Sequence, residues 1–138
     1  MSLNSAQAHA VAAALMQLEQ ALADIERLLD GPVAGVTQTF VTDMSPITVQ
    51  QVRQGCDEIR GRIAELIELF QLPQRRWNVR RVIVAEMTSA WCSLEDSRPA
   101  KLRHYGAVYT TLIETLDSRL DRLSRLVMAV KDLASKGQ

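Results

Sequence analysis

Residues 102–133 read LRHYGAVYTTLIETLDSRLDRLSRLVMAVKDL, and they decide the fold because large apolar side chains recur in them at every third or fourth position. The stripe consists of Leu102, Tyr105, Tyr109, Leu112, Leu116, Arg119, Leu123, Leu126, Val130 and Leu133, with Arg119 as its one charged member. This spacing places the side chains along one side of an α-helix, as in helical bundles and coiled coils. The sequence therefore predicts a long C-terminal helix that needs a surface to pack against.

Two earlier stretches, residues 8–29 and 49–70, have the same spacing. We expect helices from about Ser5 to Leu29, from Ser45-Pro46 to just before Leu72-Pro73, over roughly residues 75–94, and from Ser97-Arg98-Pro99 to Lys136. Gly106 is the weak point of the last helix, where a kink is expected. These elements predict an all-α protein with one domain, residues 1–138. The expected fold is a four-helix antiparallel bundle with a long connection between the first two helices and an over-long C-terminal helix.

The connection between Asp30 and Ser45 leaves two topologies open. It contains a β-prone run at residues 36–42 and can fold as a cap over an up-down bundle. Alternatively, about 12 extended residues reach roughly 40 Å, which is as long as a 25-residue helix of roughly 37 Å. In that case the connection would cross the bundle and make the first two helices parallel.

The composition limits the compartment and the partners that we expect for this protein. The formal net charge is zero, which argues against general binding to polyanions, and no window reaches the 18 apolar residues of a membrane span. The Ala-rich start lacks the Lys or Arg of a signal peptide, since the first basic residue is Arg27. We therefore expect a cytoplasmic protein with no membrane partner, in which Cys56 and Cys92 are reduced and buried.

Sequence patterns for catalysis or metal binding are absent. His9 and His104 lie on different predicted helices, and neither follows a carboxylate at the Glu-x-x-His spacing of di-iron bundles. A zinc site would need a third ligand that the sequence does not suggest, and there is no Gly-rich phosphate loop, Gly-x-Ser-x-Gly or His-Glu-x-x-His. We expect no enzyme activity, no catalytic residues, no metal and no cofactor.

Four arginines form a candidate anion site. Arg75, Arg76, Arg80 and Arg81 fall in the first two turns of the third predicted helix, where the helix dipole disfavours cations. An exposed cluster of this kind could hold a phosphate, an acidic peptide or a nucleic-acid backbone. The alternative is that Glu65 and Glu68, at the end of the second helix, neutralise the arginines across a short turn. Nucleic acid is an unlikely partner because the chain has no basic excess.

Two further groups of residues are expected in the interior of the bundle: a polar layer and a pair of tryptophans. Counting outward from the turns places Arg60, Glu86 and Tyr109 at one height, which predicts a polar layer that sets helix register. Trp77 and Trp91 are fourteen residues apart and would point the same way along the third helix, whose centre is apolar on all faces. We expect them in the core, with an interface or an apolar ligand between the helices as alternatives.

The length of the last helix predicts association. A third helix of about 22 residues would cover it only to about Arg119, leaving roughly 25 Å of apolar helix without cover. The expected homodimer interface consists of Leu120, Leu123, Leu126, Val127, Val130 and Leu133. Opposite charges of the chain ends, −4 for residues 1–46 (one base, five acids) and +4 for residues 97–138 (eight bases, four acids), favour contact between them. The sequence thus predicts a non-enzymatic, self-associating interaction or scaffold module that forms a homodimer or binds another protein; the alternative is a bundle that binds an apolar ligand or an anion.

Overall fold

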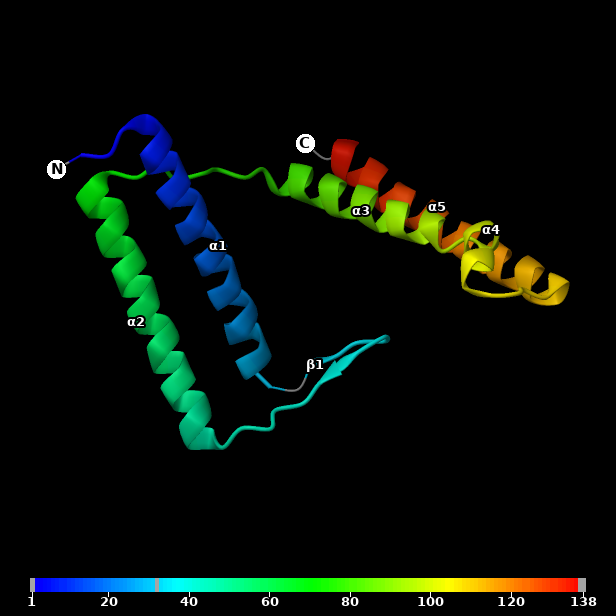
Figure 1. Ribbon diagram of the computed structural model, residues 1–138, viewed down its shortest axis with the longest axis horizontal. Helices are drawn as coiled ribbons and strands as arrows, with labels where there is room; N and C mark the ends of the chain where they lie inside the picture. The colour runs from blue at the N-terminus through cyan, green and yellow to red at the C-terminus, as the bar shows by residue number, and fades with distance from the viewer. Residues whose placement is uncertain (1, 32, 137–138) are drawn as a thin grey trace. The chain divides into compact units, whose positions relative to one another are not determined.

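The chain is all-α in the computed structural model, which describes residues 2–31 and 33–136 (Figure 1). The helices are α1 Ser5–Leu29, α2 Pro46–Phe70, α3 Val79–Asp96, α4 Pro99–Leu102 and α5 Thr110–Lys136, with a 3-10 helix η1 at Arg103–Tyr105 and two short strands, β1 Val33–Ala34 and β2 Thr39–Phe40. The chain divides into two compact units, Met1–Arg75 and Arg76–Gln138, each built on a helical hairpin. The four-helix bundle and the single domain therefore remain predictions.

The bounds of α1 and α2 are those that the sequence predicted, and so is the cap of α2, whereas the cap of α1 at Asn4 was not predicted. Asn4 caps α1, because its side chain accepts a hydrogen bond from the backbone of Gln7 at 2.8 Å and the Gln7 side chain accepts one from the backbone of Asn4 at 3.0 Å. Ser45 caps α2 by accepting a bond from the backbone of Thr48 at 3.2 Å, and Pro46 follows in the first turn.

The helices α1 and α2 are antiparallel, which is the up-down alternative. Arg53 of α2 donates hydrogen bonds to the carbonyl of Leu29 at 2.9 Å and to Asp30 at 3.1 Å. About two turns further along α2, Arg60 forms an ion pair with Glu26, which lies earlier on α1. The connection does not cross the hairpin. Instead β1 and β2 pair antiparallel within it, with Val33 opposite Phe40 and Ala34 opposite Thr39.

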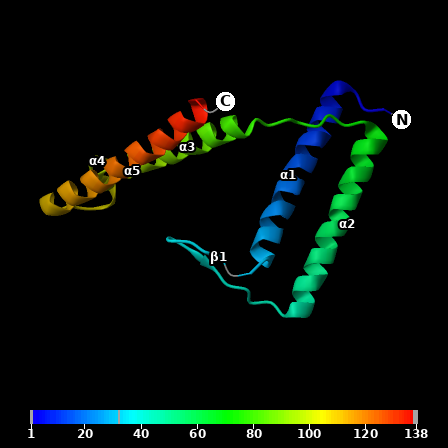
Figure 2. The same cartoon turned by 180° about the vertical axis from the view of Figure 1, so that it is seen from behind.

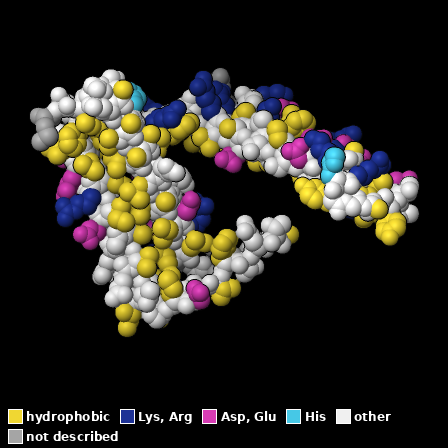
Figure 3. Space-filling model, in the orientation of Figure 1, with side chains coloured by type: hydrophobic (Ala, Val, Ile, Leu, Met, Phe, Trp, Pro, Cys, Tyr) yellow, Lys and Arg dark blue, Asp and Glu magenta, His cyan; other side chains and the backbone are white. Residues whose placement is uncertain are grey.

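The core of the first unit is small. Leu22, Cys56 and Ile63 form its buried centre, and Leu15, Val52 and Ile67 pack against them. Other members of the same predicted stripes, Leu18, Ile25, Ile59 and Leu66, remain exposed. Figure 3 shows hydrophobic side chains at the surface along both helices. A pair of helices covers only one flank of each apolar stripe, so the other flank stays open to solvent.

In the second unit, α3 begins at Val79, four residues later than expected. Residues 72–78 have no regular structure, and Asn78 precedes the helix in an extended conformation, φ −81° and ψ 121°. This later start leaves Arg75 and Arg76 outside the helix and puts Arg80 and Arg81 in its first turn.

The last predicted helix is broken rather than kinked. Gly106 has φ 146° and ψ 175°, a conformation essentially restricted to glycine, and it separates α4 and η1 from α5. After this break, α5 runs in the direction opposite to α3 (Figure 1). The result is an 18-residue α3 beside a 27-residue α5.

The long helix overhangs at the end opposite to the expected one. Ser124 of α5 is hydrogen-bonded to Glu95 near the end of α3, and Trp91, one turn earlier, lies beside Met128 and Asp132. The C-terminal part of α5 therefore runs back along α3, as Figures 1 and 2 both show. In this register the end of α3 at Asp96 is level with about residue 123, so the residues beyond it are roughly the first thirteen of α5, and not the C-terminal ones. None of the described helices is long and apolar enough to cross a membrane.

Candidate interaction surface

The face of α5 that packs on α3 is centred on a polar residue. Ser124 is the one residue of α5 classed as buried, at 4 % exposure. The partly buried residues lie around it on the same side of the helix: Ile113, Leu116, Leu120, Asp121, Val127, Met128, Lys131 and Ala134. Five of these residues are large apolar side chains and two are charged, and α3 itself has no fully buried residue. Packing within the unit therefore combines polar contacts with only part of the apolar surface that α5 carries.

The stripe that dominates the sequence lies on a different side of α5 and is open. Leu112, Leu123, Leu126, Val130 and Leu133 are all exposed, with Leu126 at 59 % and Leu133 at 71 %. At about 100° per residue, the centre of this set is roughly 135°, or more than a third of a turn, from Ser124. We call these five residues the open stripe. Of the predicted dimer residues, four belong to it, whereas Leu120 and Val127 lie on the half-buried flank towards α3.

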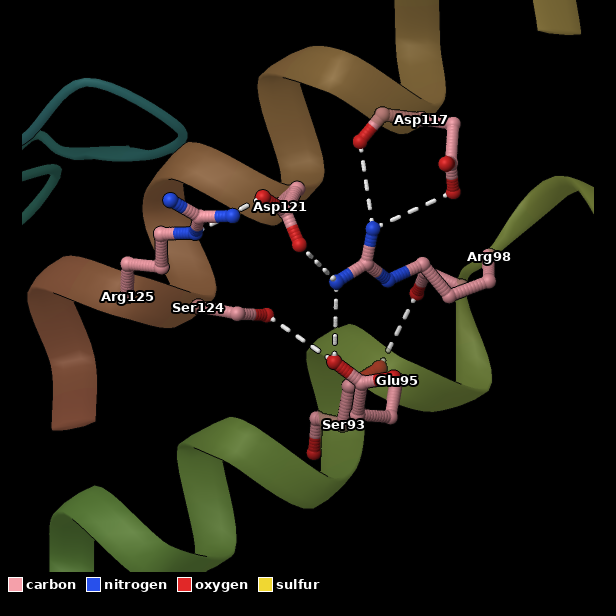
Figure 4. A network of polar contacts seen from close by, with 8 residues as sticks. Ser93, Glu95, Arg98, Asp117, Asp121, Ser124 and Arg125 are labelled. Carbon is pink, nitrogen blue, oxygen red and sulfur yellow. Dashed lines mark hydrogen bonds and ion pairs between the residues drawn. The ribbon is translucent and has the colours of Figure 1, made fainter.

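A polar network holds α3 and α5 together where the chain turns from α3 into α4 (Figure 4). Arg98 has an 18 % exposed side chain, and its Nη1 donates to the carbonyl and to Oδ1 of Asp117, both at 3.1 Å. Its Nη2 donates to Glu95 at 3.0 Å and to Asp121 at 3.3 Å. Ser124 donates to the same Glu95 oxygen at 3.1 Å. One guanidinium thus connects three carboxylates on two helices and sets their register.

The network shifts the ionisation of its members. The hydrogen bond from Arg98 lowers the pKa of Glu95, against desolvation, which raises it, and the bond from Ser124 lowers it further. The same bond to Glu95 raises the pKa of Arg98. Asp96, at 2.7 Å, raises the pKa of Lys101 by a similar hydrogen bond. Glu95, Arg98 and Lys101 therefore stay charged near neutral pH, and the cluster is a set of ion pairs in which the buried Nε of Arg98 has no hydrogen-bond partner.

Sequence reasoning missed this network, although a signal was present. Asp117, Asp121 and Ser124 follow the same four- and three-residue spacing as the apolar stripe, and so mark a second, polar line along the helix. A line of this kind on a helix indicates a second packing face. The stripe was predicted to pack on the third helix only up to about Arg119; in the structure, the side of α5 that carries the polar line packs on α3.

The four arginines of the predicted anion site lie partly in an irregular segment and partly in a helix. Arg75 and Arg76 lie in the irregular segment between α2 and α3, while Arg80 and Arg81 lie in the first turn of α3. Arg80 is half-buried and Arg81 is exposed. Glu65, proposed as a neutralising partner, is 3.2 Å from Arg62 on its own helix. The anion site and its neutralisation remain predictions.

Arg60 has a different partner from the one predicted. It pairs with Glu26 of α1, a residue that the counting argument could not reach because the direction of α1 was open. Glu86 and Tyr109 are both exposed within the second unit, with Tyr109 at 78 %. The shared polar layer of these three residues remains a prediction.

The two tryptophans do not share a helix stripe, because Trp77 lies before the start of α3. Both are exposed rather than in a core, Trp77 at 58 % and Trp91 at 37 %. Trp91 lines a shallow groove between α3 and α5, whose other walls include Arg125, Met128 and Asp132 along with members of the Arg98 network. Charged side chains and the apolar Trp91 and Met128 both line this groove, and an apolar ligand between the helices stays a prediction.

The prediction of two buried thiols is right for one cysteine and wrong for the other. Cys56 is buried in the core of the first unit, whereas Cys92 is exposed on α3. Cys56 lies on the side of α2 that packs against Leu22 of α1, whereas Cys92 lies on another side of α3 than its partly buried residues, such as Met87 and Leu94.

No protein-family model, curated protein or solved structure matches this chain. Within residues 2–31 and 33–136, no group of His, Cys, Asp and Glu side chains is placed to hold a metal ion.

Proposed function

We propose that the protein is a non-enzymatic, self-associating helical interaction module. The observation that carries the proposal is the open stripe: the most regular apolar face of α5 is exposed, while a more polar face of the same helix packs on α3. Complete burial of a Leu or Val side chain is worth about 1.5–3 kcal/mol relative to exposure. A continuous row of such side chains along one helix is typical of a surface that another helix covers.

A four-helix antiparallel bundle is the arrangement that we propose for the assembled protein. Each helical hairpin has one covered and one open flank, and two hairpins that face each other would cover both. Since homo-oligomers are mostly two-fold symmetric, a homodimer with self-complementary patches is the simplest assembly. The same physical argument applied to the first unit, with Leu18, Ile25 and Leu66 exposed, supports an assembly that buries both hairpins.

Sedimentation equilibrium at micromolar concentration tests this function. We expect a dimer for the parent chain and a monomer for Leu126→Glu, because a carboxylate in the middle of the open stripe would have to be desolvated on association. Ser118→Glu is the matched control, since Ser118 is exposed on α5 outside the stripe. This variant should keep the parent mass.

A parent chain that remains monomeric with full helicity would contradict the proposal. If such a monomer carried a bound small molecule in native mass spectrometry, the alternative function of a ligand-binding bundle would take its place.

A further inference from the structure

We propose that α5 pairs with α5 of a second copy in the antiparallel direction, about a two-fold axis that passes between Leu123 and Leu126. The inference rests on the self-association proposed above and adds the occupant of the open stripe and its orientation. It also follows from the structure that the occupant is not α3, which packs on the other face of α5.

The open stripe, together with Arg119 and the partly buried Leu116, has the pattern of a coiled-coil seam. Leu112, Arg119, Leu126 and Leu133 are seven residues apart, and Leu116, Leu123 and Val130 form a second series between them. These two series correspond to the d and a positions of a heptad repeat. With the axis between Leu123 and Leu126, Leu126 faces Leu123 of the second copy and Leu133 faces Leu116. Leu120 and Val127 then lie on the flank between α3 and the second copy.

Arg119 argues against the parallel orientation. It is exposed and is the single charged member of this seam. Parallel pairing would place it directly opposite Arg119 of the second copy, with two like charges inside an apolar seam. In the antiparallel arrangement Arg119 faces Val130 instead, and the two arginines are about 11 residues, or roughly 16 Å, apart along the helix.

The charge of α5 is self-complementary in the same orientation. Residues 110–121 contain Glu114, Asp117 and Asp121 against Arg119, a net charge of −2. Asp117 and Asp121 face α3, where Arg98 binds them, but Glu95 cancels the charge of Arg98, so this half as a whole stays acidic. Residues 122–136 contain Arg122, Arg125, Lys131 and Lys136 against Asp132, a net charge of +3. Antiparallel pairing sets the acidic half of one helix beside the basic half of the other, whereas parallel pairing sets like beside like. The antiparallel orientation also opposes the two helix dipoles.

Pulsed electron paramagnetic resonance on the full chain tests the orientation. Nitroxide labels are attached in a Cys92→Ser background, in which the remaining Cys56 is buried, at one of two exposed positions of α5, Thr111→Cys or Arg125→Cys. Position 125 is next to the proposed axis, so its two labels should lie at the same height and give a short distance. Position 111 is about 27 residues from its symmetry mate, so its labels should be separated by roughly 40 Å along the helices.

The control carries Leu126→Glu together with the label at position 111, and it should lose the intermolecular distance. Short distances at both positions would overturn the antiparallel pairing but leave self-association intact. Long distances at both positions would show that the copies meet through another surface, which also overturns the inference. No intermolecular distance at either position, with a monomeric mass, would overturn this inference and the proposed function together.

Discussion

Arg98 is the residue on which the second unit depends most. It lies at the junction of α3 and α4, and its guanidinium connects Glu95 with Asp117 and Asp121 of α5. Because Ser124 is the only α5 side chain classed as buried in the described part of the chain, the α3 and α5 pair is positioned by polar geometry more than by apolar packing. Bonds between charged groups are directional, so they specify one register, while apolar surfaces can slide.

The lowered pKa of Glu95 predicts a pH dependence of stability. Since the folded pKa lies below the ordinary value of 4.5, the ionised carboxylate stabilises the fold above that pH. This contribution should be lost as the pH falls through the lowered pKa. We expect the urea midpoint, followed by circular dichroism between pH 7 and pH 2, to fall more steeply in the parent than in Glu95→Gln. Identical profiles for the two chains would show that the ion pair with Arg98 does not stabilise the fold.

The two cysteines should differ in reactivity. Cys92 is exposed and should react with a thiol reagent within the mixing time of an ordinary assay, whereas Cys56, at 4 % exposure, should react only when the first unit opens. Titration with a chromogenic disulfide should therefore release about one equivalent rapidly and a second in denaturant. Cys92→Ser should remove the rapid phase alone. A rapid phase that survives in this variant would place Cys56 outside the core.

Among the elements, the segment from α4 to α5 shows how one residue changes an architecture. The apolar spacing runs from Leu102 to Leu133 without interruption, yet the helix does not. Gly106 adopts φ 146°, and a Cβ there would meet no atom within 4 Å, so the backbone conformation alone requires glycine. Tyr105 and Tyr109, which the stripe predicted on the seam, are consequently exposed around the break.

Substitution of Gly106 should therefore destabilise the protein. We expect Gly106→Ala to lower the free energy of unfolding by about 1–3 kcal/mol, the usual cost of such backbone conformations for residues other than glycine. Gly61→Ala is the matched control, because Gly61 is exposed within α2 and also has free space around its Cα. In a helix this change should stabilise by about 0.5–1 kcal/mol. A more stable and more helical Gly106→Ala chain would mean that α4 and α5 can join into one helix.

For the whole molecule, the shortage of buried apolar surface is the dominant feature. The buried hydrophobic residues among those described are Leu22, Cys56, Ile63 and Leu72, all in the first unit. Two-helix hairpins with cores of this size have little stability of their own. Association should therefore contribute a large share of the stability of the folded chain.

This contribution makes stability depend on protein concentration. For a dimer that unfolds to two chains, each tenfold increase in concentration should add about 1.4 kcal/mol per dimer at 25 °C and raise the melting temperature by a few degrees. Leu126→Glu should melt at a lower temperature that no longer depends on concentration, while Ser118→Glu should behave like the parent. Differential scanning calorimetry over a hundredfold range of concentration measures this. A melting temperature that is constant in the parent would exclude stabilisation by self-association.

The sequence by itself determined the helices and most of their ends. Ser5–Leu29 and the start of α2 at Pro46 could be predicted because apolar periodicity and capping residues act within a few positions along the chain. The apolar stripe of the C-terminal helix was likewise visible in the sequence, and its cover by another surface stays a prediction. These properties depend on neighbours in sequence, and no knowledge of the fold is required for them.

Only the tertiary structure decided which face of each helix is used, and in which register. The partners Arg60–Glu26 and Arg98–Asp121 are 34 and 23 residues apart in sequence, and nothing local specifies them. The overhang of α5 was expected at its C-terminal end and lies at the other, because the break at Gly106 changes where α5 begins relative to α3. An apolar stripe predicts that one face of a helix packs against something. Which element packs there depends on the direction and length of every connection, and these are fixed only in the tertiary structure.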